Sequence, residues 1–292
     1  MPKYLKGHEI KNLNIVRHII PIVLLFIPQI AIKLYNIVDK TMIGYMIADK
    51  AELGNYEEAY KVINVLFTVV SSLGIVMVPR IASVFATGDK KKLNEYIMKS
   101  FRFIFFLAFP MMMGIITISK EFVPIFLGGG YETASTIING LAPMILFCGI
   151  TNVIGTQYLL PTKRQKEYTI SILIGLIVNI IFNLILIPIW GAFGAGIVTT
   201  LSQLIVAIVQ SHYVKNEINI LYAFRSGKKY LIASIAMYII CMILGLFIPG
   251  GAISIIIKII VGATIYFLIL IILRDKYVYE VRDIVKRYLK RK

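Results

Sequence analysis

The chain has 292 residues, of which 58% are hydrophobic and 16% are charged, and its mean hydropathy is +0.81. This balance excludes an ordinary soluble globular domain and is typical of a membrane protein. The formal net charge of +16 would suit a nucleic-acid-binding protein, but the basic residues are dispersed among short loops without a binding module, so we expect no nucleic-acid partner. Anionic membrane lipids are the better partner for these charges.

Apolar runs of membrane-spanning length recur along the whole chain. An α-helix needs about 20 apolar residues to cross a hydrocarbon core of roughly 30 Å, and only helices and closed barrels satisfy the backbone there. The runs predict an all-α polytopic membrane protein with about eight transmembrane helices. The predicted spans cover residues 18–38, 60–85, 101–119, 134–158, 167–188, 192–212, 229–248 and 252–273.

The loops between these spans differ in charge. Lys and Arg in short loops resist translocation, so basic loops stay on the cytoplasmic side. With a cytoplasmic N-terminus, the basic residues left outside are Lys40, Lys50, Lys61 and Lys120. We therefore predict a multi-pass protein of the cell membrane with both termini cytoplasmic.

The first predicted span carries a row of polar residues at helical spacing: Gln29, Lys33, Asn36 and Lys40. At about 100° per residue they fall within an arc of about 60°. A charged side chain at the centre of a bilayer costs about 2.5 kcal/mol or more, so this row is expected to face a bundle interior or a watery cavity. In the alternative interpretation, Lys33 snorkels to the outer surface and the amides hold neighbouring helices together.

The second predicted span repeats this pattern with Lys61, Asn64, Thr68 and Ser71, within an arc of about 80°. Asp39 lies about 100° round from Lys40, so its side chain points toward a neighbouring helix. It is a candidate partner for a buried cation. For Lys258, alone in the last span, we favour the snorkelling interpretation.

Polar residues of the fifth and sixth predicted spans share helix faces as well. They are Asn179 and Asn183 on one span, and Thr199, Gln203 and Gln210 on the next. We interpret both sets as packing contacts between helices. The stretch GAFGAG, residues 191–196, predicts a close approach of two backbones.

Two basic stretches have an apolar helical face, as interfacial helices do. GDKKKLNEYIMKS, residues 88–100, predicts a short interfacial helix with Leu93, Tyr96 and Ile97 on its apolar face. The tail carries apolar residues at helical spacing over residues 277–288. It is either a lipid-binding helix or a solvated helix without a specific partner.

Catalytic and metal-binding patterns are not evident. Cys148 and Cys241 make no ligand spacing, and the sequence offers no Ser/His/Asp set. We expect no enzyme activity, no metal and no cofactor.

Several motifs in the first half of the chain resemble a known family. LFIPQIAIKLYNIVDKTMIG ends in the D-K-x-M-x-G pattern at residues 39–44, and ELGNYEEAYKV follows it. VMVPRIASVFATGDKKKLNEYIMKS, FLGGGYETAS and NVIGTQYLLPT come next in the expected order. Together they resemble the second half of the polysaccharide biosynthesis flippases, which belong to the multidrug/oligosaccharidyl-lipid/polysaccharide exporter superfamily.

The resemblance implies a two-lobed exporter around a central cavity, often with two extra helices. Residues 1–216 would be the six-helix second lobe, and residues 217–292 the two additional helices with a basic amphipathic tail. Such proteins are thought to flip an undecaprenyl-pyrophosphate-linked oligosaccharide across the cytoplasmic membrane, often driven by an ion gradient. Transport by rocking of one lobe against the other needs both lobes. Three explanations are therefore open: a fragment of a longer reading frame, a half-transporter that pairs with a separate first-lobe polypeptide, and a homodimer. We favour the fragment.

On this hypothesis, Lys33 and Lys61 stabilise the diphosphate and Asp39 neutralises them between cycles. Arg80, with Lys99 and Arg102, gathers the headgroup at the inner surface. The complete set of predicted substrate-binding residues is Lys33, Asn36, Asp39, Lys40, Lys61, Asn64 and Arg80. The alternatives are a multidrug or other lipid exporter of the same superfamily, and a non-transporting scaffold that holds glycan-assembly enzymes.

Overall fold

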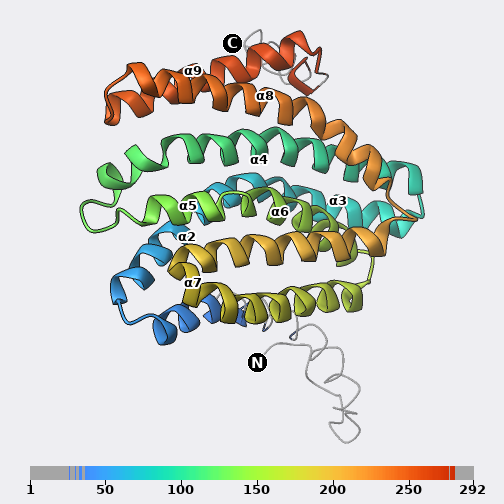
Figure 1. The fold of residues 1–292 in the computed structure, drawn as a ribbon. Helices are drawn as coiled ribbons and strands as arrows, with labels where there is room; N and C mark the ends of the chain where they lie inside the picture. Colours follow the sequence, from blue (N-terminus) through green and yellow to red (C-terminus); the bar gives the residue numbers. More distant parts are fainter. Residues whose placement is uncertain (1–25, 27–29, 31–32, 35–36, 276, 280–292) are drawn as a thin grey trace, which may run out of the picture.

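The computed structural model describes residues 26, 30, 33–34, 37–275 and 277–279, and in that part the chain forms helices and turns without a strand. Residues 37–46 are helical. Figure 1 shows the helices that follow, which are α2 (Lys50–Ser71), α3 (Leu73–Thr87), α4 (Lys90–Phe126), α5 (Ala134–Leu141), α6 (Met144–Thr151), the π-helix η3 (Asn152–Leu159), α7 (Gln165–Val214), α8 (Ile220–Phe247) and α9 (Ala252–Ile272). The predicted all-α class is confirmed.

Local sequence explains where several helices begin. Asp49 caps α2 by accepting a hydrogen bond from the amide of Ala51 at 2.9 Å. Asp89 caps α4 by accepting one from the amide of Lys92 at 2.9 Å. Gly88, with φ of 73°, ends α3 in the left-handed conformation just before that cap. These capping residues fix the turns that separate successive helices.

Five described helices have the length and composition needed to cross a membrane, or up to six crossings if the pair α2 and α3, bent by 41°, counts as one. Every predicted span after the first has a helical counterpart among them. The span predicted at 134–158 is made of α5, α6 and η3 in series. Most of the first predicted span lies outside the described residues, so the prediction of eight helices in all stays a prediction.

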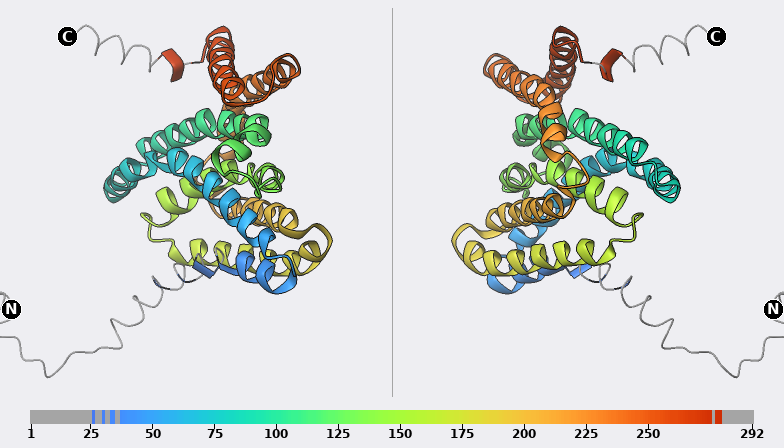
Figure 2. Two further views of the ribbon diagram at one scale, coloured as in Figure 1. Left: turned by 90° about the vertical axis from the view of Figure 1, so that its left-hand side faces the viewer. Right: turned by 90° about the vertical axis from the view of Figure 1, so that its right-hand side faces the viewer.

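Helix α7 is a hairpin of two antiparallel helices rather than one rod. Its backbone leaves the helical region at Gly191, with φ of 59° and ψ of −143°. Figures 1 and 2 show the two halves side by side. A Cβ on Gly194 would lie 2.4 Å from the carbonyl oxygen of Leu186, so the close backbone approach predicted for residues 191–196 is confirmed. Farther from the turn, the Gln210 amide donates to Ser171 at 3.0 Å.

Helices α8 and α9 form a second hairpin that packs against α4, at the top of Figure 1. Phe106 of α4 makes ring contacts with Tyr230 and Tyr266. The hydroxyl of Tyr266 donates to the Phe106 carbonyl at 2.8 Å. Lys258 is buried and pairs with Glu121 near the end of α4, with Nζ and Oε1 2.5 Å apart. The snorkelling interpretation of Lys258 was therefore wrong, because a carboxylate on the neighbouring helix lies within reach.

The predicted interfacial helix at residues 88–100 was also wrong. Residues 90–100 are the first turns of α4, a helix of 37 residues, and Gly88 and Asp89 cap the ends of α3 and α4. The face of Leu93, Ile97 and Phe101 is buried against the protein. Its apolar spacing is that of a core-facing helix, which sequence alone does not distinguish from a membrane-surface helix. Most of the amphipathic tail lies outside the described residues.

Large apolar side chains remain exposed along α7, α8 and α9, including Ile181, Trp190, Leu246, Phe247 and Ile253. Such continuous apolar surfaces are costly in water and stable in hydrocarbon. The chain is a multi-pass membrane protein.

Candidate functional site

Asp39 is a carboxylate buried where the helix of residues 37–46 meets α2 and α7. Its side chain is 2% exposed. Oδ2 accepts hydrogen bonds from the hydroxyls of Tyr56 at 2.9 Å and Thr199 at 2.7 Å. Oδ1 accepts from the amides of Asn179 at 2.9 Å and Asn183 at 2.6 Å. One carboxylate thus links α2 and both halves of the α7 hairpin to the helix that precedes them.

The partners of Asp39 are all neutral. In the part of the chain that the structure describes, no Lys or Arg pairs with it. Lys40 projects from a different face of the same helix and pairs instead with Glu57 of α2, with Nζ and Oε1 3.1 Å apart. In this structure Asp39 points into α7 and bonds to neutral side chains, so its predicted role in neutralising Lys33 and Lys61 between cycles stays a prediction.

This environment defines what the site can do chemically. Burial without a countercharge opposes the ionised form of Asp39, and the four donated hydrogen bonds support it. A proton or a small cation would remove the remaining cost of the uncompensated charge. Two hydroxyls and two amide nitrogens contact it, and the Asn183 Oδ1 atom close by is buried without a partner among the described atoms. Carboxylate, amide and hydroxyl oxygens are the ligands that hard cations prefer. The cluster is therefore a candidate site for a proton or a small cation.

The predicted cationic residues do not share this cluster. Lys33 and Arg80 are exposed, and Lys61 is exposed beside Glu58, with Nζ and Oε1 2.6 Å apart. Lys40 is only partly buried, in its pair with Glu57. Asn36 lies outside the described residues. Substrate contact by any of these residues stays a prediction.

The polar row of α2 follows one side of that helix. Lys61, Asn64 and Thr68 are exposed, and Ser71 is half-buried. The hydroxyls of Thr68 and Ser71 donate to carbonyls of their own helix, at 2.8 and 3.2 Å. These bonds satisfy the hydroxyls without a neighbouring helix, so the row is compatible with a water-facing surface.

A cavity of about 280 Å³ opens beside this row, between α2, the α6–η3 segment and the two halves of α7. Four amide side chains line it: Asn64, Asn152, Gln203 and Gln210. Tyr60 also lines it, and the Tyr60 ring stacks at 6.2 Å on that of Tyr56, which donates to Asp39. The cavity is therefore next to the buried carboxylate.

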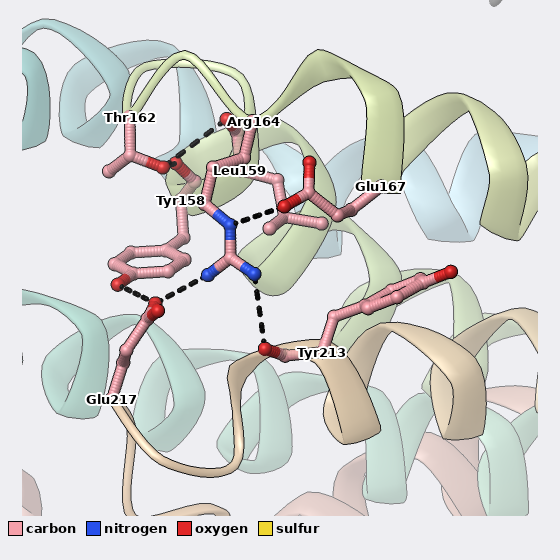
Figure 3. Close-up of polar contacts among 7 residues, drawn as sticks. All are labelled: Tyr158, Leu159, Thr162, Arg164, Glu167, Tyr213 and Glu217. Atoms are coloured by element: carbon pink, nitrogen blue, oxygen red, sulfur yellow. Dashed lines mark hydrogen bonds and ion pairs between the residues drawn. The ribbon is translucent and has the colours of Figure 1, made fainter.

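A charged cluster joins the helix ends far from the Gly191 turn, and Figure 3 shows its contacts. Arg164 contacts Glu167 at 2.9 Å, Glu217 at 2.5 Å and the Tyr213 carbonyl at 3.1 Å. Tyr158 of η3 donates to the same Glu217 carboxylate at 2.6 Å. Burial opposes the charge of Arg164, but the carboxylates of Glu167 and Glu217 hold its pKa above the usual value. The cluster ties η3 to both ends of α7.

Sequence reasoning identified Asp39 but missed its partners. Asn179, Asn183 and Thr199 were interpreted as packing contacts, and Tyr56 was not selected. The sequence did offer an indication: Asn179 and Asn183 lie one turn apart in the middle of an apolar span, and polar side chains there need a polar partner on another helix. Which polar residue faces them depends on helix packing.

Comparisons with known proteins give a consistent result. A family model described as polysaccharide biosynthesis protein matches residues 22–136. The probable low-salt glycan biosynthesis flippase Agl15 of Haloferax volcanii is 23% identical over 64% of this chain and 39% of its own length. The lipid II flippase MurJ of Bacillus subtilis is 24% identical over 81% of this chain and 48% of its own length. The resemblance to the polysaccharide biosynthesis flippases is confirmed.

A solved structure of lipid II flippase MurJ in an inward closed conformation matches the fold of this chain, with a TM-score of 0.74 and 18% sequence identity. The match covers 86% of this chain and 53% of that one. The chain thus spans about half the length of the curated relatives and of the solved structure that it matches.

Proposed function

We propose that the chain is the second lobe of a flippase that moves lipid-linked glycans across the cytoplasmic membrane, with both termini on the cytoplasmic side. One observation carries the proposal: a row of exposed polar side chains, with Lys61 in it, runs along α2 of a chain whose fold matches about half of a lipid II flippase. A lysine facing lipid tails would cost about 2.5 kcal/mol or more. A polar substrate pathway shared with a first lobe removes that cost.

Within this proposal the cargo is an undecaprenyl-pyrophosphate-linked oligosaccharide. Ammonium groups attract a diphosphate as point charges, and Lys33 and Lys61 are both exposed to meet it. Arg80 lies in α3, beyond the 41° bend from Lys61, and would meet the headgroup at the inner surface with Lys99 and Arg102. The lysines at the outer end would hold it later in the cycle.

Asp39 would couple this movement to an ion gradient. Uptake of a proton or a small cation changes the charge at a point that links α2 with both halves of α7. A ligand shifts a conformational equilibrium only through a difference in affinity between the two states. The buried carboxylate supplies such a difference if the packing of α2 against α7 differs between inward-facing and outward-facing states.

The first lobe would come from the remainder of a longer protein or from a separate polypeptide. A multidrug or other lipid exporter is the alternative within transport, and the exposed lysines favour an anionic cargo over a cationic drug. A scaffold for glycan-assembly enzymes would work through its basic tail, so deletion of residues 274–292 should abolish enzyme capture in a scaffold and largely spare export in a flippase.

The test is glycan export in cells that depend on this protein together with its first lobe. Lys33→Ala and Asp39→Ala are expected to abolish export while the amount of protein in the membrane is unchanged. Lys120→Ala, a lysine at the outer end of α4 and outside the proposed pathway, is the matched control. Normal export in both variants would contradict the proposed mechanism.

A further inference from the structure

The cavity between α2, η3 and α7 combines apolar side chains with polar groups that carry no charge. Among the described residues that line it, none is acidic or basic. It offers amides from Asn64, Asn152 and Gln203, and the hydroxyls of Thr151 and Thr156. Groups of this kind donate and accept hydrogen bonds without attracting an ion. The exposed lysines nearby offer the opposite chemistry, because they attract anions.

Aromatic rings form part of the same wall. Tyr60 and Tyr168 line the cavity together with Phe67. Such rings give flat apolar contact area, and the tyrosines add a hydroxyl. A pyranose has the same two kinds of surface, since its ring faces carry C–H groups and its edges carry hydroxyls. Amides, hydroxyls and aromatic faces together match a neutral sugar.

One wall of the cavity is formed by an irregular helix, η3. η3 is a π-helix, a rare element that is frequent at functional sites. A Cβ on Gly155 would lie 2.7 Å from the Tyr168 ring and 2.9 Å from the Gln210 Nε2 atom. Glycine at this position therefore lets both side chains approach the η3 backbone and form the deep wall.

Gln210 supplies an independent indication of a ligand. It is 1% exposed, and its Nε2 atom donates to Ser171 at 3.0 Å. Its Oε1 atom is buried without a partner among the described atoms, although its side chain lines the cavity. An unsatisfied buried acceptor costs about 1–3 kcal/mol, and a sugar hydroxyl that met this oxygen after a small movement of the Gln210 side chain would remove that cost.

We propose that this cavity, lined by Asn64, Asn152, Thr156, Tyr168, Gln203 and Gln210, is a binding subsite for a neutral sugar of the transported glycan. The inference rests on the proposed function and adds a division of labour to it: the lysines meet the diphosphate, and the cavity holds sugar. Its volume of about 280 Å³ lies just below the range of typical ligand pockets, roughly 300–1,000 Å³. It therefore takes one or two sugar units and leaves the rest of the glycan outside.

The experiment measures sugar binding to the full chain in lipid nanodiscs free of sugar-based detergent. Saturation-transfer NMR is recorded with free N-acetylglucosamine and galactose, and phosphorus NMR with inorganic pyrophosphate as the anionic probe. Gln203→Leu removes an amide from the cavity wall while the size of the side chain stays nearly constant. Asn64→Leu removes a second amide at an exposed position, where the substitution does not threaten folding. Gln165→Leu, one turn before Tyr168 at the start of α7 and outside the cavity lining, is the matched control.

We expect saturation transfer to at least one sugar, with affinity roughly three- to tenfold weaker in each cavity variant, the equivalent of one neutral hydrogen bond. Gln165→Leu should bind like the wild type, and pyrophosphate binding should not change in Gln203→Leu. Equal sugar affinity in all four proteins, or pyrophosphate binding without sugar binding, would overturn the subsite. Because this assay measures binding alone, its result is independent of the export assay. Normal export without sugar binding would contradict the sugar subsite and leave the flippase proposal standing. Sugar binding without export would contradict the flippase proposal.

Discussion

Asp39 Oδ1 and Asn183 Nδ2 lie 2.6 Å apart, although 144 positions separate the two residues in the chain. The contact joins the helix of residues 37–46 to the first half of the α7 hairpin. It exists only because the hairpin packs beside the helix of residues 37–46. The predictions below begin with this contact.

Asp39→Asn should preserve the size of the side chain and remove its ability to bind a charge. If Asp39 holds a small cation, that cation stabilises the folded protein, by about 2.7 kcal/mol at a concentration one hundred times its Kd. Thermal melting in nanodiscs with Na⁺, Li⁺ or K⁺ in place of choline, at constant ionic strength, measures this effect. The Tm of the wild type should rise with at least one cation and that of Asp39→Asn should not; an equal rise in both proteins would place the cation elsewhere.

Lys258→Met should destabilise the packing of α9 on α4. The Lys258 side chain is 6% exposed and that of Glu121 is 18% exposed. Removing one partner of a buried pair leaves an uncompensated charge and costs about 3–5 kcal/mol. The double variant Lys258→Met with Glu121→Gln should recover much of that loss in a denaturation experiment. If the double variant is as unstable as the single one, the ion pair is not the cause.

Glu52→Ala should loosen the turn of the α7 hairpin. The Glu52 Oε2 atom accepts a hydrogen bond from the amide of Ala192 at 2.8 Å, where the second half of α7 begins. Loss of a side-chain cap costs about 1 kcal/mol. Hydrogen exchange of the amides just after Gly191 should accelerate in this variant. Glu95→Ala, an exposed position on α4, is the control and should leave their exchange unchanged.

Gly191→Ala should destabilise the same turn by a different route. Gly191 has φ of 59° and ψ of −143°, and a Cβ there would lie 2.9 Å from the Glu52 Oε2 atom. Strain of this kind costs about 1–3 kcal/mol. Gly54→Ala, within α2 and with open space around its Cβ, should instead stabilise by about 0.4–1 kcal/mol. A comparison of the two melting temperatures checks the difference in sign.

The close approach at residues 191–196 was predictable, because several glycines and alanines between two apolar runs permit a tight turn. The placement of residues 88–100 was not. Leu93, Ile97 and Phe101 have the spacing of an apolar helix face, and that spacing is the same for a membrane-surface helix and for the start of α4. Contact with the rest of the protein decides between them.

For the candidate site, sequence identified Asp39 and Lys61 because charges in apolar runs are costly and therefore conspicuous. It assigned Asp39 a cationic partner, whereas the structure gives it two amides and two hydroxyls. Asn64, Gln203 and Gln210 were each visible as polar residues on separate helices. Their meeting around one cavity depends on how α2 and the α7 hairpin pack.

By itself, the sequence determined that this protein lies in a membrane, that it is helical, and which residues break the apolar surface, because each of these follows from the transfer energy of individual side chains and from helical periodicity. The tertiary structure decided which of those polar residues meet. Partners such as Asp39 and Asn183 lie on helices far apart in the chain, and their contact depends on the relative rotation and crossing of those helices. Packing among many side chains sets that rotation, and no short stretch of sequence encodes it.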